Sequence, residues 1–179
     1  MRLLDLFCKA GGAAKGYHEA GFEVVGVDHE PQPRFPFQFI LGDAIEFLEL
    51  LIASGRIKEF DVIHLSPPCQ PYSSLRSLAR KHPPLIDILW QILAPTDTPY
   101  ISENVPGAPL KNYVMLCGTM FGLKVIRHRW FECHPKILMS PASCAHQRPV
   151  VALGRKPNRE KHYAAVYGHF SDVEFAREA

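Results

Sequence analysis

The first 105 residues alternate between short apolar runs, which are typical of buried strands, and segments with apolar residues at helical spacing. Strands are predicted at residues 2–7, 22–28, 37–41, 60–65 and 99–105. A turn at residues 8–16 is predicted to lead into a first helix that Gly21 ends. Two further helices are predicted at 44–54 and 84–93. Strands that alternate with helices in this way predict an α/β protein with a doubly wound, mostly parallel sheet.

The pattern changes beyond residue 105. Residues 115–123 are predicted to be a glycine-containing loop, and residues 124–132 an alternating strand with Arg127 and Arg129 on one face. Residues 135–162 are rich in proline, serine and basic side chains without periodicity, and 163–168 form a possible last strand. We expect one catalytic domain over residues 1–179, in which 133–162 form a short, basic, irregular segment.

Composition and charge narrow the class of protein. The chain has 179 residues, 47% of them hydrophobic, and no apolar run of bilayer length, which argues against a disordered or membrane protein. Five cysteines and no signal peptide favour a reducing cytoplasm. Residues 1–123 carry a net charge of −3, whereas residues 124–161 carry +7. A basic segment of this kind suits contact with a polyanion, although it is equally an ordinary solvated face.

A glycine turn follows the first strand. Gly11 and Gly12 lie between that strand and the first helix, where a backbone can approach a nucleotide closely. Asp28 ends the second strand and is placed to accept hydrogen bonds from a ribose diol. Asp43 is predicted to be a helix N-cap, a contact to an adenine amino group, or both.

A cysteine follows the fourth predicted strand, in the run Ser66-Pro67-Pro68-Cys69-Gln70. Prolines stiffen the backbone on both sides of Cys69, and loops at the carboxyl ends of strands carry the chemistry of open α/β sheets. A lone cysteine here would be read as a small packing residue. The motifs elsewhere in the chain favour a nucleophile instead.

These segments, in this order, resemble the DNA (cytosine-5) methyltransferase family. Residues 5–12 look like its first cofactor motif, the run around Cys69 like its nucleophile motif, and Glu103-Asn104-Val105 like its second catalytic motif. Arg127-His128-Arg129 looks like the tail of Q-x-R-x-R. The resemblance covers about residues 1–132. It implies a Rossmann-like S-adenosylmethionine-dependent methyltransferase fold, S-adenosylmethionine as cofactor and DNA as partner, as in restriction-modification.

The resemblance also implies roles for individual residues. Cys69 would add to carbon 6 of cytosine, and Glu103 would protonate nitrogen 3. Asn104 would hold the loop or touch the base, and Arg129, with Arg127 as the weaker candidate, would contact the base carbonyl or a phosphate. Arg127, Arg129 or His64 would supply positive potential for the Cys69 thiolate. The cofactor contacts implied are Asp5, Phe7, Lys9, Ala10, Gly11, Gly12, Asp28, His29, Asp43, Ala44 and Pro67.

Three departures from the family pattern leave alternatives open. Lys9 stands where the family has glycine, only a short segment follows Glu132, and no closing helix is evident. The chain is then a minimal viral-type member, a shortened chain, or one half of a split enzyme whose partner chain supplies the helix. Alternative functions are a catalytically idle DNA-binding or regulatory subunit, and a methylase of free cytosine nucleotides. Phosphate contacts are expected from Arg76, Arg80 and Lys81 and from the basic segment.

Four residues near the end of the apparent sheet raise the question of zinc. Cys133, His134, Cys144 and His146 have ligand-type side chains, but their spacing matches no standard zinc finger. We therefore predict no metal site from the sequence, and we expect Cys8 and Cys117 to be packing residues.

Overall fold

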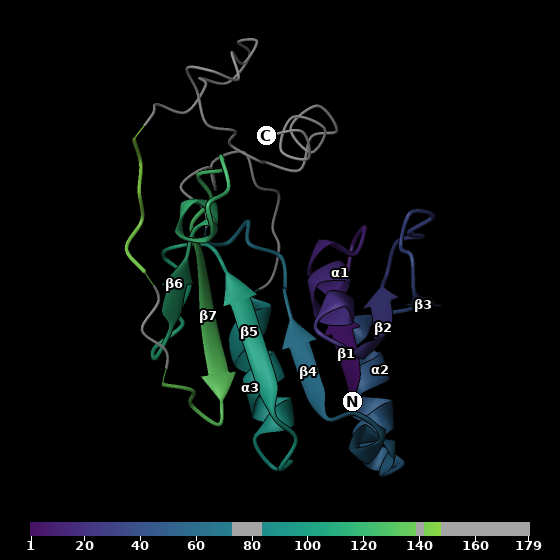
Figure 1. Cartoon of the computed structure of the whole chain (residues 1–179). Coiled ribbons are helices and arrows are strands. Elements are labelled where there is room, and N and C mark those ends of the chain that lie inside the picture. Colours follow the sequence, from purple (N-terminus) through teal and green to yellow (C-terminus); the bar gives the residue numbers. More distant parts are fainter. Residues whose placement is uncertain (73–83, 139–141, 148–179) are drawn as a thin grey trace. The chain divides into compact units, whose positions relative to one another are not determined.

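The computed structural model describes residues 1–72, 84–138 and 142–147 (Figure 1). The chain divides into two compact units. Of the described residues, the first unit contains those of Met1–Tyr113 and Phe131–Ile137, and the second contains Val114–Trp130, Leu138 and 142–147. The predicted strand at 163–168, the basic residues Arg76, Arg80 and Lys81, and most of the segment 133–162 lie outside the described residues.

Seven strands form a sheet in the order β3-β2-β1-β4-β5-β7-β6. The strands are β1 (Arg2–Leu6), β2 (Glu23–Asp28), β3 (Gln38–Leu41), β4 (Val62–Leu65), β5 (Tyr100–Asn104), β6 (Val114–Leu116) and β7 (Arg129–His134). The pairs from β3 to β5 are all parallel, whereas β7 runs opposite to β5 (Figure 1). The prediction of a doubly wound, mostly parallel α/β sheet is confirmed.

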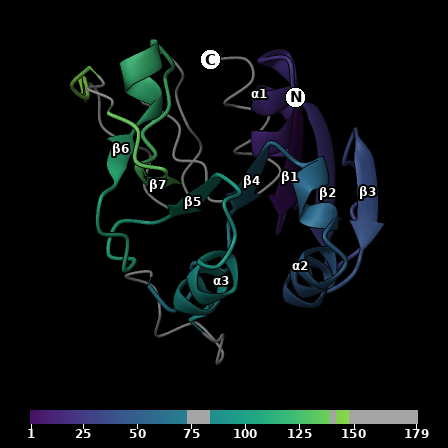
Figure 2. The same ribbon diagram turned by 90° about the horizontal axis from the view of Figure 1, so that it is seen from below.

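Helices cover both faces of the sheet in the first unit. Helix α1 (Gly12–Glu19) lies on one face, and α2 (Ala44–Ala53) and α3 (Leu85–Leu93) lie on the other (Figure 2). The alternation along β1 explains this arrangement, because Leu4 and Leu6 pack in the core that includes α2 and α3, while Leu3 packs in the core beside α1. A short 3-10 helix, η1 (Arg56–Glu59), precedes β4.

The sheet order creates a switch point between β1 and β4. From β1 the chain moves outward to β2 and β3, then returns to β4 on the other side and continues to β5. Ligands of open α/β sheets bind where the strand order reverses, at the carboxyl ends of the strands. The glycine turn after β1 and the Cys69 loop after β4 are the two segments that meet there.

Three boundaries differ from the sequence prediction. Helix α1 begins at Gly12, so the turn is shorter than 8–16. The predicted loop at 115–123 contains strand β6 and the 3-10 helix η3 (Gly118–Phe121). Strand β7 begins at Arg129 rather than at residue 124, so Arg127 precedes it. In the stretch before it, the Val125 carbonyl accepts a hydrogen bond from the Cys117 thiol at 3.9 Å.

One aromatic ring fills a slot made by two glycines. A Cβ atom on Gly26 would lie 2.3 Å from Phe35 Cζ, and one on Gly11 would lie 2.9 Å from Phe35 Cδ2. Phe35 belongs to the proline-rich connection between β2 and β3, and its side chain is buried. The absence of side chains at the two glycines therefore lets this connection anchor against both the turn before α1 and the strand β2.

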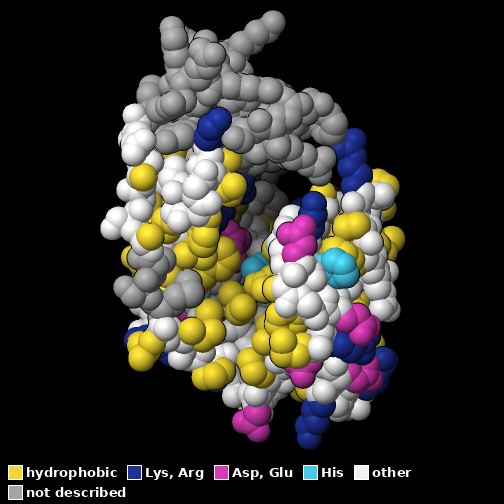
Figure 3. Space-filling view, viewed as in Figure 1, with side chains coloured by type: hydrophobic (Ala, Val, Ile, Leu, Met, Phe, Trp, Pro, Cys, Tyr) yellow, Lys and Arg dark blue, Asp and Glu magenta, His cyan; other side chains and the backbone are white. Residues whose placement is uncertain are grey.

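Charged side chains of both signs gather around the amino-terminal end of β1 (lower right in Figure 3). Arg2 pairs there with Glu23 at 3.1 Å and with Glu59 at 3.5 Å, and Arg56 pairs with Glu59 at 2.7 Å. This end of the sheet is opposite to the carboxyl ends that form the switch point. Over the described ranges, none of the helices has the length and apolar character needed to span a bilayer.

Candidate active site

The turn after β1 has a strained backbone. Phe7 and Lys9 have φ angles of 64° and 45°, and Gly11 has a φ angle of 83°. This left-handed region favours glycine, so the turn holds two side chains in a conformation that L-residues rarely adopt. The backbone N–H groups of Phe7 and Cys8 donate to the Val27 carbonyl at 2.9 and 3.2 Å, which fixes the turn against β2.

Lys9 covers the carboxylate that ends β2. The Asp28 side chain is buried, and its Oδ2 atom accepts a hydrogen bond from the Lys9 backbone N–H at 3.0 Å. The Lys9 ammonium lies 3.5 Å from Asp28 Oδ1 and 2.9 Å from Glu30 Oε2. The exposed His29 ring lies 3.4 Å from the same Asp28 oxygen. Lys9, which stands where the resembled family pattern has glycine, is thus paired with Asp28, the carboxylate predicted to bind a ribose.

Replacing Lys9 separates the backbone effect from the ion pairs. Lys9→Gly and Lys9→Ala both remove the ammonium, but only glycine removes the cost of the left-handed conformation. We expect the glycine variant to be more stable than the alanine variant by about 1 kcal/mol. Urea denaturation of both variants and the wild type measures this difference. Equal stability of the two variants would contradict a strained turn at position 9.

Asp5 is a buried carboxylate without a partner. Its side chain is 1% exposed, and among the described residues neither carboxylate oxygen has a hydrogen-bond partner. Burial, followed by the negative charges of Asp28 and Glu103, raises the pKa of Asp5 to about 7. An acceptor pair held in this way at the carboxyl end of β1 is suited to the hydrogen-bond donors of a ligand.

The Cys69 loop is anchored to the end of β1. The Ser66 backbone N–H donates to the Leu6 carbonyl at 3.3 Å, and the Ser66 hydroxyl lies 3.4 Å from the Phe7 carbonyl. The Tyr72 N–H donates to the Cys69 carbonyl at 3.0 Å and closes a turn around the cysteine. Cys69 itself is a free, half-buried thiol. The loop that carries it therefore begins beside the glycine turn.

A buried side-chain amide connects the loops after β4 and β5. Asn104 is 1% exposed, and its Nδ2 atom donates to the Pro67 carbonyl at 3.0 Å. Its Oδ1 atom accepts a hydrogen bond from the Val105 N–H at 2.9 Å. Both ends of the amide are thus used, one to hold the Cys69 loop and the other to shape the end of β5.

Glu103 lies on the face of the sheet that α1 covers. Its neighbour Ser102 accepts a hydrogen bond from Trp90 of α3 at 2.8 Å, so the alternation along β5 directs Glu103 to the opposite face. In the parallel register Ser102 pairs with Leu65, which places residue 103 level with the start of the Cys69 loop. The half-buried Glu103 is close enough to raise the pKa of Asp5 by its charge.

His64 does not provide positive potential. Its ring is 1% exposed, and Nδ1 lies 3.0 Å from the Tyr17 hydroxyl of α1. Burial lowers the pKa of His64 to about 4, so the ring is uncharged at neutral pH. The expectation that His64 could activate Cys69 by its charge is therefore wrong. No pattern in the sequence pointed to Tyr17, because its partner lies 47 residues away on a strand.

The remaining sequence candidates are placed as follows. Asp43 is the N-cap of α2 and accepts hydrogen bonds from Ile45 N–H at 2.8 Å and Glu46 N–H at 3.1 Å. Arg127 and Arg129 belong to the second unit, where Arg129 Nη1 donates to the His128 carbonyl at 2.9 Å. Ala10 is exposed in the glycine turn, and Ala44 is buried in the first turn of α2.

The solved structures to which this fold is similar have low sequence identity to the chain. A hypothetical protein of Thermus thermophilus has a TM-score of 0.48 at 17% identity, over 74% of this chain and 73% of that chain. A SAM-dependent methyltransferase of Archaeoglobus fulgidus has a TM-score of 0.37 at 21% identity, over 59% and 45%. One from Agrobacterium tumefaciens has a TM-score of 0.39 at 23% identity, over 59% and 38%.

Sequence comparison is more specific. The chain is similar to the Type II methyltransferase M.AgeI of Thalassovita gelatinovora, with 33% identity over 41% of this chain and 20% of that protein. The chain thus spans about a fifth of the length of this curated relative. A sequence model of C-5 cytosine-specific DNA methylases matches residues 1–108, which is more than half of the chain. The chain therefore belongs to the C-5 cytosine-specific DNA methylase family, whose cofactor is S-adenosylmethionine.

Proposed function

We propose that this chain methylates carbon 5 of cytosine in DNA through a covalent bond between Cys69 and carbon 6. The observation that carries the proposal is the hydrogen bond from Asn104 Nδ2 to the Pro67 carbonyl. It couples the loop of the proposed nucleophile to the strand end of the proposed acid. Two groups that must flank one pyrimidine ring need a fixed separation, and a buried hydrogen bond is a suitable device for this.

The cofactor pocket is proposed at the glycine turn. The unpartnered Asp5 carboxylate offers acceptors for the ammonium group of the methionine part. Asp28 is proposed to accept hydrogen bonds from the ribose in competition with its contacts to Lys9. Among the described residues, apart from the chain neighbours and the helix's own backbone, no heavy atom lies within 4 Å of a Cβ built on Gly12. The first residue of α1 therefore leaves open space beside the helix N-terminus. Phe7, Lys9, Ala10, Gly11, His29, Asp43, Ala44 and Pro67 complete the proposed contacts. When bound, S-adenosylmethionine provides the electrophilic methyl group.

Cys69 and Glu103 would act together on the base. The Cys69 thiolate donates its electron pair to carbon 6, and Glu103 transfers a proton to nitrogen 3 of the ring. The aromaticity is broken and carbon 5 becomes nucleophilic, as methylation requires. Loss of the carbon 5 proton to a base and cleavage of the S–C6 bond restore the ring, and the nitrogen 3 proton returns to Glu103.

The proposed role of Glu103 requires its carboxyl group to hold a proton. The charge of Glu103 is close enough to Asp5 to contribute to the raised pKa of Asp5. Arg127 and Arg129 are proposed to contact the base carbonyl or a phosphate, which would disperse negative charge. The target base must be single-stranded or flipped out of the duplex, because its ring atoms are otherwise stacked. The further phosphate contacts from Arg76, Arg80 and Lys81 remain predictions.

Product analysis tests this proposal. The full chain is incubated with labelled S-adenosylmethionine and, in separate reactions, duplex DNA, single-stranded DNA and deoxycytidine monophosphate. We expect 5-methyldeoxycytidine in nucleoside digests of the DNA, and a much slower reaction of the free nucleotide. Calorimetry with S-adenosylmethionine is the companion measurement. Cofactor binding without any methylated product would favour the regulatory subunit, and methylation of the nucleotide alone would favour the nucleotide methylase.

A further inference from the structure

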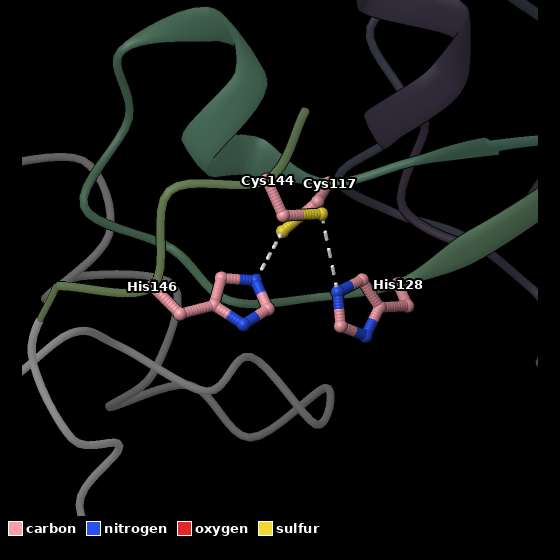
Figure 4. A group of neighbouring side chains, drawn as sticks. All are labelled: Cys117, His128, Cys144 and His146. Carbon is pink, nitrogen blue, oxygen red and sulfur yellow. Dashed lines mark hydrogen bonds between the residues drawn. The ribbon is translucent and has the colours of Figure 1, made fainter. Parts of the chain in front are cut away.

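Four side chains of metal-binding type come together in the second unit. They are Cys117, which precedes η3, His128, which precedes β7, and Cys144 and His146 of the segment 142–147 (Figure 4). One ligand atom from each of them lies within 4.8 Å of the others. Figure 4 shows both rings turned toward the two sulfur atoms. The proposed methylation uses none of these four side chains, so the cluster needs another explanation.

The distances match those of a tetrahedral zinc centre. Cys117 Sγ lies 3.5 Å from His146 Nε2, and Cys144 Sγ lies 3.5 Å from His128 Nε2. With Zn–S bonds of about 2.3 Å and Zn–N bonds of about 2.0–2.1 Å, a tetrahedral angle separates sulfur from nitrogen by about 3.5–3.6 Å. In each ring Nε2 is the nitrogen that lies next to a cysteine sulfur, so each ring presents one ligand atom to the group.

Neighbouring contacts have the form of an outer shell around a metal ligand. The Thr119 hydroxyl donates to Cys117 Sγ at 3.4 Å and accepts a hydrogen bond from the Ala145 N–H at 3.3 Å. It therefore links the segment of one cysteine to the segment of the other. A Cβ atom on Gly118 would lie 2.7 Å from the Val125 carbonyl oxygen, which shows how closely the chain approaches itself beside the cluster. Hydrogen bonds that orient a thiolate ligand are typical of zinc sites.

A metal centre would explain how the described part of the second unit is held together. Its described residues contain little regular structure: the three-residue strand β6, the four-residue helix η3 and the first residues of β7. Segments this short bury little apolar surface, and small folding units of this kind use a metal to hold their loops. Cys117 is 2% exposed, Cys144 and His128 are half-buried, and His146 is exposed, so an ion has a route from solvent.

We propose that Cys117, His128, Cys144 and His146 bind one structural Zn²⁺ ion. Two thiolates and two imidazoles fill the four positions of a tetrahedron, which leaves none for a substrate or a reactive water. The site departs from the sequence-based prediction of no metal. Cys144 and His146 were among the four residues considered for zinc in the sequence. The other two ligands are Cys117 and His128, not Cys133 and His134. Because His128 stands between Arg127 and Arg129, the ion would fix the backbone that presents these two basic residues.

Metal analysis of the purified full chain tests the site. The protein is expressed with zinc in the medium, passed through gel filtration and analysed by inductively coupled plasma mass spectrometry. We expect about one zinc per chain, with stoichiometry falling at least fivefold in both Cys117→Ser and Cys144→Ser. Cys133→Ser is the matched control and should keep the metal. Wild-type protein without bound zinc, or a loss in the control equal to that in the other two, would overturn the proposal.

Cobalt substitution covers the case in which the cysteine variants do not fold. The wild-type chain is stripped with a chelator and titrated with Co²⁺ alone. We expect a thiolate-to-cobalt charge-transfer band and the intense visible absorption of tetrahedral cobalt, saturating at one equivalent and abolished by Zn²⁺. Weak absorption typical of octahedral cobalt would rule out the Cys₂His₂ ligand set. Neither readout depends on methyl transfer, so the zinc site and the proposed function can fail separately.

Discussion

Replacing Cys69 by serine is expected to lower the rate of the proposed cytosine methylation by at least about a thousandfold. A serine hydroxyl keeps the size of the side chain but is a far weaker nucleophile toward carbon 6 at neutral pH. The loop should keep its conformation, because its anchors are the Ser66 contacts to the end of β1 and the Asn104 amide. Transfer of labelled methyl groups to DNA measures the effect.

The informative control for this change is Cys133→Ser, which alters another half-buried cysteine of the first unit. It should leave the rate within about twofold. DNA and cofactor binding should survive in the Cys69 variant, so the loss lies in the chemical step. If the Cys69→Ser variant kept half of the wild-type rate, the covalent bond between residue 69 and carbon 6 would be excluded from the proposed mechanism.

Replacing Asp5 by asparagine is expected to stabilise the fold above pH 7 while weakening the cofactor site. The shift of the Asp5 pKa from 3.8 to about 7 corresponds to roughly 4 kcal/mol of unfavourable burial for the charged form. Because the folded-state pKa is raised, the contribution of Asp5 to stability is fully present below pH 4 and is lost as the pH rises to 7. Asparagine carries no charge to bury, but its amide lacks partners, so we expect a gain of about 1–3 kcal/mol at pH 8.

The pH dependence identifies the cause. The stability difference between Asp5→Asn and the wild type should shrink as the pH falls from 8 to 4, since the wild-type carboxyl then becomes neutral. Denaturant unfolding at several pH values measures it, and Asp97→Asn in the loop before β5 is the control for a general charge effect. A constant stability difference between pH 8 and pH 4 would show that Asp5 is ionised throughout.

The affinity of the Asp5→Asn variant for S-adenosylmethionine should fall about tenfold or more.

The helices and strands of the first unit, and the strand ends that carry the candidate site, could be predicted from the sequence. Apolar runs and glycine stops placed five parallel strands within about two residues of their observed bounds. The contacts that give these ends a chemical role were not accessible, because they depend on the order of strands in the sheet. Asn104 and Pro67 are 37 residues apart in the sequence, and the residues around neither of them indicate that the two are in contact.

The second unit was poorly predicted for a different reason. Its described residues contain so little regular structure that periodicity carries little information, and the alternation at 124–132 predicted a strand that begins only at Arg129. The cluster joins Cys117 to His146 across 29 residues and His128 to Cys144 across 16. Linear spacing of that kind resembles no finger motif, so only the folded chain brings the four ligand types together.

The ring of Phe35 has a consequence for how this protein can be altered. Since it occupies space that Gly11 and Gly26 both leave vacant, the three positions form one volume rather than three separate sites. Enlarging either glycine forces the ring out, and shrinking the ring leaves a void beneath the glycine turn. Variant libraries for this region should therefore randomise positions 11, 26 and 35 jointly, because single changes sample only combinations in which the volumes no longer match.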